Sequence, residues 1–241
     1  DCIFVIKIFR IFNISKKRKI LTRKLIITGG AGFIGCHTAS YFAKKGYAVV
    51  IIDNLSRKGS LDNLNWLKNQ YPITLYKTDI QDNKAVEDIF KKEKKFKAII
   101  HLAAQVAVTT SVSNPRNDFN INALGTLNIL EAVRHYCPNA PFIYSSTNKV
   151  YGLLNNVKII EGPKRYEINK KEGISESEPL DFHSPYGCSK GSADQYVLDY
   201  ARIFNLQTVS FRQSCIYGER QFGVEDQGWL AWFIIATVLG R

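Results

Sequence analysis

The chain has 241 residues, which is enough for one large domain with a sizeable core. Its 45% hydrophobic and 22% charged residues are those of an ordinary globular protein and exclude a disordered or fibrous chain. The net charge of +12 would suit nucleic-acid binding, but much of the excess lies before residue 24, so we expect no nucleic-acid partner for the folded part.

The basic N-terminal appendage, residues 1–23, is predicted to be disordered or artefactual. Its apolar stretch is interrupted by Lys7 and Arg10 and is too short to span a bilayer. The basic cluster at 16–19 follows the apolar stretch, which is the reverse of a secretory signal. A helix lying on a membrane surface is the alternative, and we expect no stable membrane insertion.

The cysteines show no metal-ligand spacing, and their number is odd: Cys2, Cys36, Cys137, Cys188 and Cys215. They predict free thiols in a reducing cytoplasm and no metal site.

From residue 24 onward, apolar strand segments alternate with helical segments. The predicted strands are Leu25–Thr28, Ala48–Asp53, Thr74–Lys77, Ala98–Leu102, Phe142–Ser145 and Thr208–Phe211. The predicted helices are Phe33–Lys45, Asn83–Lys92, Asn117–Tyr136 and Pro185–Phe204. This alternation predicts the α/β class, a doubly wound parallel sheet covered by helices on both faces. The polar segment 152–184 is predicted to be a long loop, either functional or a solvated excursion.

A glycine-rich turn joins the first predicted strand to the first predicted helix. Gly29, Gly32 and Gly35 allow a tight turn, close approach of a pyrophosphate, and packing of the helix on its strand. The helix begins at Phe33 and Ile34, where free N–H groups face phosphates. The pattern predicts a dinucleotide site, with a purely structural turn as the alternative.

Asp53, with Asn54 beside it, ends the second predicted strand. A carboxylate there can accept both hydroxyls of an adenosine ribose and would repel a 2′-phosphate. The pattern therefore favours NAD over NADP, although Arg57 and Lys58 nearby leave NADP as the alternative.

Polar and small residues end the third and fourth predicted strands. Asp79, followed by Ile80, is expected to accept a hydrogen bond from the adenine amino group, or else to cap a helix. His101 is interpreted as a buried core histidine without a catalytic role. The residues after it would let a cofactor pass close to the backbone: Leu102, Ala103 and Ala104.

A hydroxyl and a Tyr–Lys pair supply the predicted chemistry. Thr147 follows the fifth predicted strand, at the carboxyl edge where open sheets bind ligands. Tyr186 and Lys190 lie one turn apart on one face of a predicted helix. An ammonium beside a phenol lowers its pKa, so the pair is expected to remove a proton from an alcohol while a hydride leaves the same carbon. A packed Tyr beside a solvated Lys is the alternative. Asn122 is expected mid-helix beneath this site, as a buried amide.

Together these motifs resemble the extended short-chain dehydrogenase/reductase family, from residue 24 to the C-terminus. Four blocks are similar to its CDP-paratose 2-epimerase (CDP-tyvelose epimerase) subgroup, at residues 144–152, 181–191, 194–202 and 218–232. The dehydratases of the family carry an Asp-Glu pair where this chain has Asn148 and Lys149, so dehydration is not expected. The 4-epimerases usually have small residues there and a shorter stretch before the tyrosine.

The resemblance implies an NAD-binding Rossmann domain at residues 24–241 that includes the start of a substrate lobe. Family members continue further, so a truncated sequence with most of that lobe missing is expected. The apolar segment 229–239 is then a helix without its packing partners. Cys215 stands where many relatives have an Asn that contacts the sugar nucleotide.

The resemblance also implies the catalytic trio Thr147, Tyr186 and Lys190. In such an epimerase, NAD⁺ takes a hydride from sugar C2 while Tyr186 accepts the hydroxyl proton, and the hydride then returns to the opposite face. Lys190 would bind the nicotinamide ribose and hold the pKa of Tyr186 down. A CDP-sugar is the favoured substrate, and a homo-oligomer is expected through the helices at 117–136 and 185–204.

Three alternatives stay open at this point. The first is a UDP-sugar 4-epimerase or related sugar-nucleotide reductase that uses the same trio. The second is an NAD-binding sensor or scaffold without catalysis. The third is a chain that binds NAD but is inactive through truncation.

Overall fold

The computed structural model describes residues 23–168 and 173–241, so the predicted appendage lies outside the described residues except for Arg23. Six strands form one parallel sheet in the order β3-β2-β1-β4-β5-β8. These strands are β1 (Lys24–Thr28), β2 (Ala48–Ile52), β3 (Ile73–Tyr76), β4 (Ala98–His101), β5 (Phe142–Thr147) and β8 (Thr208–Gln213). The order in which strands are added reverses between β1 and β4, since β2 and β3 lie on one side of this pair and β5 and β8 on the other, which makes it the switch point of a doubly wound sheet.

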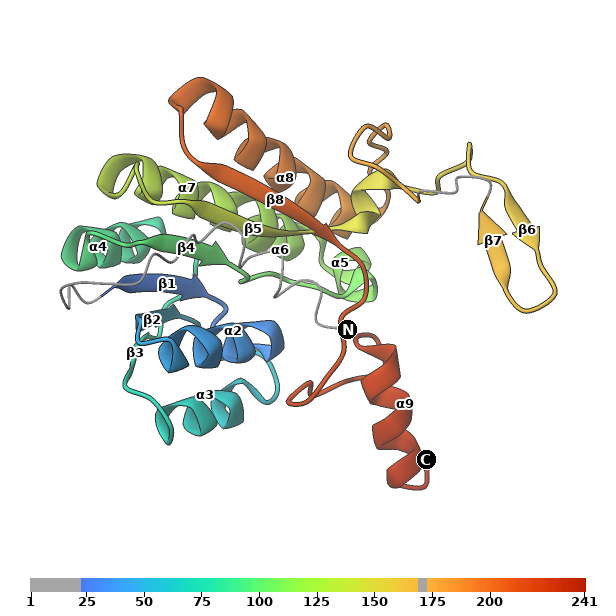
Figure 1. Ribbon diagram of the computed structural model, residues 1–241, viewed down its shortest axis with the longest axis horizontal. Helices are drawn as coiled ribbons and strands as arrows, with labels where there is room; N and C mark the ends of the chain where they lie inside the picture. Colours follow the sequence, from blue (N-terminus) through green and yellow to red (C-terminus); the bar gives the residue numbers. More distant parts are fainter. Residues whose placement is uncertain (1–22, 169–172) are drawn as a thin grey trace.

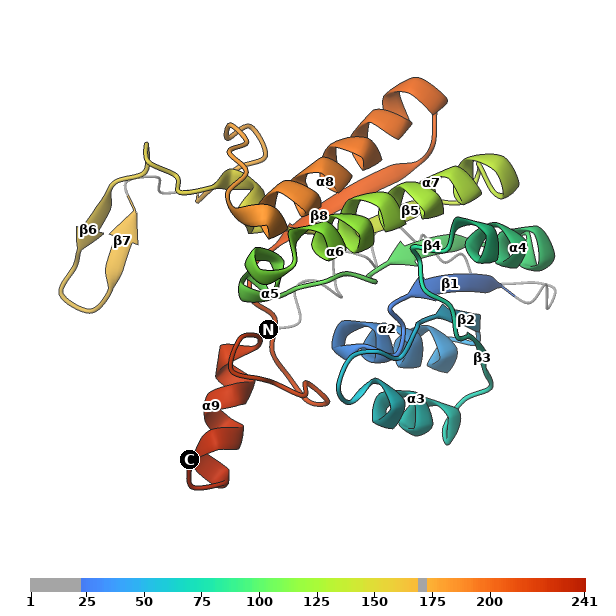
Figure 2. The same ribbon diagram turned by 180° about the vertical axis from the view of Figure 1, so that it is seen from behind.

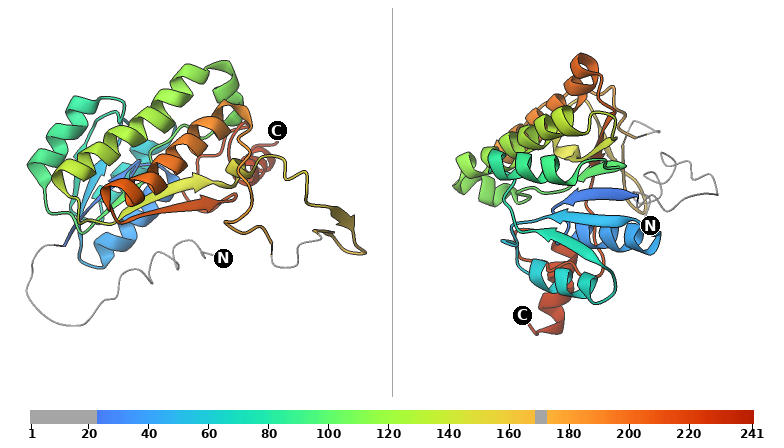
Figure 3. Two further views of the ribbon diagram at one scale, coloured as in Figure 1. Left: turned by 90° about the horizontal axis from the view of Figure 1, so that it is seen from above. Right: turned by 90° about the vertical axis from the view of Figure 1, so that its left-hand side faces the viewer.

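Helices cover both faces of this sheet (Figures 1 and 2). On one face lie α2 (Phe33–Lys44) and α3 (Ser60–Lys68). On the other lie α4 (Asn83–Glu93), α7 (Gly125–Tyr136) and α8 (Ser184–Phe204), which run side by side in Figure 3. Shorter helices α5 (Val108–Ser113) and α6 (Pro115–Phe119) precede α7. The predicted fold class is confirmed.

The strands read as continuous apolar runs because both of their faces are buried. In β1, Leu25 and Ile27 belong to the core on the α2 and α3 side, whereas Ile26 packs in the core beneath α4, α7 and α8. All three side chains are fully buried. Alternate residues of one strand therefore build two separate hydrophobic cores, one on each face of the sheet.

The predicted helix at 117–136 is interrupted. It consists of α6, a π-helical turn at Asn120–Leu124 and α7. A Cβ at Gly125 would lie 2.6 Å from the Ile80 side chain, so the chain approaches the neighbouring layer closely at this point. Single π turns of this kind occur often at functional sites.

Two further differences from the prediction concern short elements. The segment 152–184 is not wholly a loop, because it contains an antiparallel hairpin of β6 (Ile159–Glu161) and β7 (Tyr166–Ile168), which projects from the body in Figure 1. Gly162 lies between the two strands, where the sequence had indicated only a loop. Helix α3 was not among the segments singled out from the sequence.

The C-terminal apolar segment forms the predicted helix, α9 (Trp229–Val238). None of its residues is buried, and Trp229 and Phe233 are 57% and 61% exposed. Among the described helices, none is both long and apolar enough to cross a membrane.

Candidate active site

The glycine-rich turn between β1 and α2 has the tight geometry that the sequence predicts. Gly29 has a φ of +67°, and a Cβ there would lie 2.7 Å from the Ala103 backbone nitrogen. A Cβ at Gly35 would overlap the Gly29 carbonyl oxygen, so the first turn of α2 packs directly on the loop. Only glycine fits both positions, and the N–H groups at the start of α2 are left facing a pocket of about 250 Å³.

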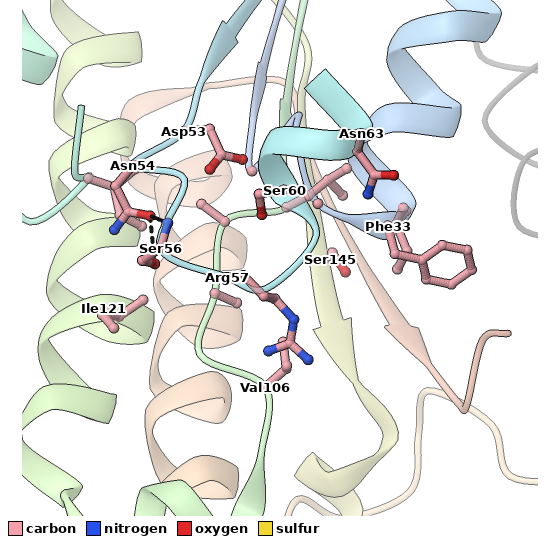
Figure 4. A pocket seen from close by; sticks show the side chains of 18 of the residues that line it. Phe33, Asp53, Asn54, Ser56, Arg57, Ser60, Asn63, Val106, Ile121 and Ser145 are labelled. Atoms are coloured by element: carbon pink, nitrogen blue, oxygen red, sulfur yellow. Dashed lines mark hydrogen bonds between the residues drawn. The ribbon is translucent and has the colours of Figure 1, made fainter. Parts of the chain in front are cut away.

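Asp53 lies in the wall of this pocket, at the end of β2 (Figure 4). One of its carboxylate oxygens accepts from the Ala31 N–H at 3.0 Å, and the other accepts from the Leu55 N–H at 2.8 Å. Burial raises the pKa of Asp53, and these two backbone donors oppose the shift. The carboxylate is therefore fixed between the glycine turn and the next loop, with its remaining lone pairs available to a ligand.

The loop after Asp53 brings a cation into the same pocket. Figure 4 shows the Arg57 side chain among the lining residues, beside Ser56 and Asn54, whose side chains hydrogen-bond each other at 2.8 Å. Asp53 and Arg57 thus put both signs of charge at this end of the pocket.

Asp79 also lines the pocket, but it is already engaged. Its Oδ2 accepts from Asn54 Nδ2 at 2.8 Å, and its Oδ1 accepts from the Gln81 N–H at 2.9 Å. The predicted alternative, that Asp79 caps a helix, is wrong, because Asp82 is the N-cap of α4 and accepts from the Ala85 N–H.

His101 is a core histidine, as expected. Its Nδ1 lies 2.6 Å from Thr28 Oγ1 and its Nε2 lies 3.0 Å from Thr126 Oγ1. Burial lowers its pKa to about 3, so the ring is neutral at physiological pH. The Thr28 hydroxyl also accepts from the Ala103 N–H at 3.2 Å, which ties the end of β4 to the glycine turn.

Tyr186 and Lys190 both line the pocket that begins at the glycine turn, which unites the two halves of the predicted site. Helix α8 is fixed at its start because the Tyr186 N–H donates to Ser111 Oγ at 3.1 Å. The Lys190 ammonium donates to the Ser145 carbonyl at 2.6 Å and lies 4.3 Å from the centre of the Tyr144 ring. Lys190 is only 3% exposed, and no salt bridge of the described residues includes it.

The titration of this pair differs from the prediction. Burial raises the pKa of Tyr186, and a hydrogen bond with Thr147 only partly opposes the shift. The expected lowering by Lys190 is wrong for this geometry, because the ammonium is directed to the Ser145 carbonyl. Burial lowers the pKa of Lys190 to about 7, against the attraction of Asp194 and Asp118.

Thr147 and Asn122 lie beside the pocket and contact its residues. Thr147 is buried at the end of β5, where its hydroxyl accepts from the Lys149 N–H at 3.2 Å. Asn122 is buried in the π-helical turn, as predicted. Its amide group accepts from the Gln105 N–H at 2.9 Å and donates to Ser189 Oγ at 3.1 Å, one residue before Lys190. Asn122 therefore fastens the π-helical turn to α8.

All the predicted cofactor residues except Asn122 line one pocket: Gly29, Gly32, Phe33, Ile34, Gly35, Asp53, Asn54, Asp79, Ile80, Leu102, Ala103, Ala104, Tyr186 and Lys190. Several lining residues were not predicted, namely Ser60, Asn63, Val106, Ile121, Arg220, Gln221, Phe222 and Gln227. Arg220, Gln221 and Phe222 belong to a block that resembles the subgroup, which was the one available signal. Among the described residues, no group of three or more His, Cys, Asp or Glu side chains could hold a metal ion.

Three proteins with names that state an activity are similar in sequence to this chain. The chain is 54% identical over 211 residues to a CDP-paratose 2-epimerase of Salmonella typhi, a match that covers 87% of this chain and 62% of that protein. It is 35% identical to a putative UDP-glucose 4-epimerase of Methanocaldococcus jannaschii, with 87% and 61% covered. It is 33% identical to a dTDP-D-glucose 4,6-dehydratase of Dictyostelium discoideum, with 86% and 47% covered. The chain thus spans less than two thirds of the length of these relatives.

Solved structures of similar enzymes share the fold of this chain. The fold matches a UDP-glucose 4-epimerase with UDP-glucose from Thermotoga maritima, with a TM-score of 0.76 and 34% identity over 90% of this chain and 64% of that one. It also matches a Thermus thermophilus UDP-glucose 4-epimerase in complex with NAD, with a TM-score of 0.72, 31% identity, and 90% and 63% covered. A sequence profile described as GDP-mannose 4,6 dehydratase matches residues 26–226. The chain therefore belongs to this family, the nucleotide-sugar epimerases and dehydratases of the extended short-chain dehydrogenase/reductase group.

Proposed function

We propose that the chain binds NAD and belongs to an NAD-dependent nucleotide-sugar epimerase. The specific activity that we assign to this enzyme is that of a CDP-paratose 2-epimerase. The observation that carries this proposal is that Tyr186 and Lys190 line the same pocket as the glycine-rich turn. The 54% identity to a CDP-paratose 2-epimerase supports the choice of substrate.

The residues present fit a dinucleotide. The turn around Gly29 and Gly35 leaves no room for side chains, so a pyrophosphate can approach the backbone and the N-terminus of α2. Asp53 has free lone pairs for ribose hydroxyls, and the chain would hold the nicotinamide end near Tyr186 and Lys190. When bound, NAD supplies the acceptor and donor of a hydride.

The side chains of Tyr186 and Thr147 would then transfer the proton of the sugar hydroxyl. With NAD⁺ bound, the positive charge of its nicotinamide would favour the Tyr186 phenolate and oppose the effect of burial on the pKa of Tyr186. This phenolate would accept the proton of the sugar hydroxyl while the hydride leaves the same carbon, C2, to give a 2-keto sugar. Thr147, whose hydroxyl opposes the rise in the pKa of Tyr186, would hold the sugar oxygen and relay its proton. Tyr186 would return the proton to the sugar oxygen when the hydride returns to the opposite face of C2. No net oxidation occurs, and configuration is inverted.

A purely structural role for Lys190 fits the geometry poorly. Burial of an ammonium without a carboxylate in contact is costly, and a merely packed position would be occupied by an apolar side chain. Its place in the pocket argues against a sensor or scaffold without catalysis. Dehydration is also disfavoured, since Asn148 and Lys149 are exposed in a short 3-10 helix and offer no carboxyl group.

The second candidate is a UDP-sugar 4-epimerase, favoured by the relative from Methanocaldococcus jannaschii and the fold match from Thermotoga maritima. Incubation of the protein with CDP-paratose and, separately, with UDP-galactose distinguishes the two by NMR of the sugar ring. Inversion at C2 of the CDP-sugar supports the first assignment, whereas inversion at C4 of the UDP-sugar replaces it with the second. Bound NAD without either reaction would support a chain that binds the cofactor and is inactive.

A homo-oligomer stays a prediction. The exposed apolar side chains Tyr196 and Ile203 on α8, 49% and 66% exposed, support a contact between copies on that helix. Light scattering measures the assembly directly.

A further inference from the structure

After β8, the chain turns back across the molecule toward two helices that belong to the other half of the fold. Strand β8 is one edge of the sheet, whereas α2 and α3 follow β1 and β2 in the other half. In Figure 1 the segment after β8 runs toward α2 and α3 before it reaches α9. We call residues 216–223 the strap. Three of its residues line the cofactor pocket, namely Arg220, Gln221 and Phe222.

Hydrogen bonds join the strap to both helices. The ring nitrogen Nε2 of His37, on α2, lies 2.8 Å from the Glu219 carbonyl oxygen. On α3, Asn63 Nδ2 donates to the Arg220 carbonyl at 3.4 Å. The strap is therefore attached at two successive peptide units.

Two ring contacts complete the attachment. The Arg220 guanidinium carbon lies 4.0 Å from the centre of the Trp66 ring, within the range of a strong cation–π contact. The Phe222 ring occupies the space that a Cβ at Gly59 would take, directly before α3. Trp66 itself lies outside the pocket lining, so it holds the strap without facing the ligand.

The backbone of the strap is held in an uncommon conformation. Arg220 has a φ of +63°, which residues other than glycine rarely adopt. Such a conformation persists only where the surrounding contacts determine it. Loss of an anchor should therefore release the strap rather than leave it in place.

We propose that the strap closes over the bound dinucleotide and slows its release, with Trp66 as the anchor that keeps it closed. The inference rests on the proposed NAD binding. An epimerase regenerates its oxidised cofactor in the same site in each turnover, whereas a reductase must release the cofactor and bind a fresh one. A strap that prevents exchange therefore suits an epimerase better than a reductase.

The test measures release of NAD from the wild-type protein and from a Trp66→Ala variant, by chasing bound radiolabelled NAD with excess unlabelled NAD. We expect release about tenfold faster in Trp66→Ala, since the contact with Arg220 is lost. Trp66→Phe, which keeps an aromatic ring, should fall between the two. Leu61→Ala is the matched control, because Leu61 is 57% exposed on the same helix. Amide hydrogen exchange in residues 216–223 should rise in Trp66→Ala and stay unchanged in the control.

An unchanged release rate in folded Trp66→Ala would overturn the strap while leaving the proposed function intact. A wild-type protein that binds no NAD would overturn both. If Trp66→Ala does not fold, Arg220→Met removes the other half of the contact, and wild-type hydrogen exchange of the strap in that variant contradicts the proposal.

Discussion

Loss of the Arg212 guanidinium should strongly destabilise the part of the fold that carries the site. Arg212, on β8, donates to both carboxylate oxygens of Asp194 on α8, at 2.7 and 3.2 Å, and to the Tyr151 hydroxyl at 3.0 Å. The Asp194 side chain is fully buried and that of Arg212 is 12% exposed. This cluster joins α8, which carries Tyr186 and Lys190, to the edge strand of the sheet.

In Arg212→Ala the buried Asp194 carboxylate loses its only salt-bridge partner among the described residues. Removal of one partner of a buried ion pair costs about 3–5 kcal/mol. For a domain of this size that corresponds to a fall in Tm of roughly 10 °C. The matched control is Arg202→Ala, whose ion pair with Asp199 on the same helix is 67% and 51% exposed on its two sides. That pair should contribute less than about 1 kcal/mol.

Thermal and urea unfolding of both variants measure this difference. Burial alone would raise the pKa of Asp194, but the hydrogen bonds from Arg212 and Ser210 and the charge of Arg212 outweigh it and lower the pKa. Because the pKa is lower in the folded state, its contribution is present above the unfolded value of about 4 and is lost as the pH falls further. The advantage of wild type over Arg212→Ala should therefore shrink below about pH 4. Equal losses of stability in Arg212→Ala and Arg202→Ala at pH 7 would refute the reasoning.

Three other outcomes follow from the site. Tyr186→Phe should still bind NAD but lose activity by about 10²- to 10⁴-fold, and near-normal turnover in a coupled assay would remove the proposed proton transfer. Lys190→Met should unfold at a higher temperature than wild type at pH 7, with a smaller gain at pH 10. The reason is that burial lowers the pKa of Lys190 to about 7, so between that pH and about 10.5 the unfolded chain binds the extra proton and stability rises with pH. A gain that is larger at pH 10 contradicts this sign. Gly35→Ala should cost about 1–3 kcal/mol and weaken NAD binding, because its Cβ overlaps the Gly29 carbonyl. In urea unfolding Gly46→Ala, which has open space around it and a φ of +80°, is the control at about 1 kcal/mol, and equal binding of NAD by the two variants would count against the turn as the phosphate site.

Local patterns in the sequence predicted the parts of the molecule that local physics determines. Strands such as β1 are continuous apolar runs because both faces are buried, so the pattern predicts parallel strands inside a sheet covered on both faces. Gly29 and Gly35 have no space for a Cβ, and that requirement is visible as glycine spacing. The separation of Tyr186 and Lys190 is one helical turn, and the structure places both in the pocket.

Features that depend on contacts between distant segments could not be read in this way. The strap meets Trp66 through Arg220, and neither residue type nor spacing signals that pairing. The hairpin strands β6 and β7 have three residues each, which is too short for a periodic pattern. The pKa of Tyr186 was misjudged because the effect of Lys190 depends on where its ammonium points, and Ser145 takes it.

The proposed reaction is tested most directly by following deuterium at sugar C2. The protein is incubated with NAD and CDP-paratose that carries deuterium at C2 in ordinary water, and the product is examined by NMR and mass spectrometry. Transient oxidation with hydride return predicts inversion at C2 with the deuterium kept on that carbon. Inversion with loss of the deuterium to water, or inversion at another carbon, would contradict the account.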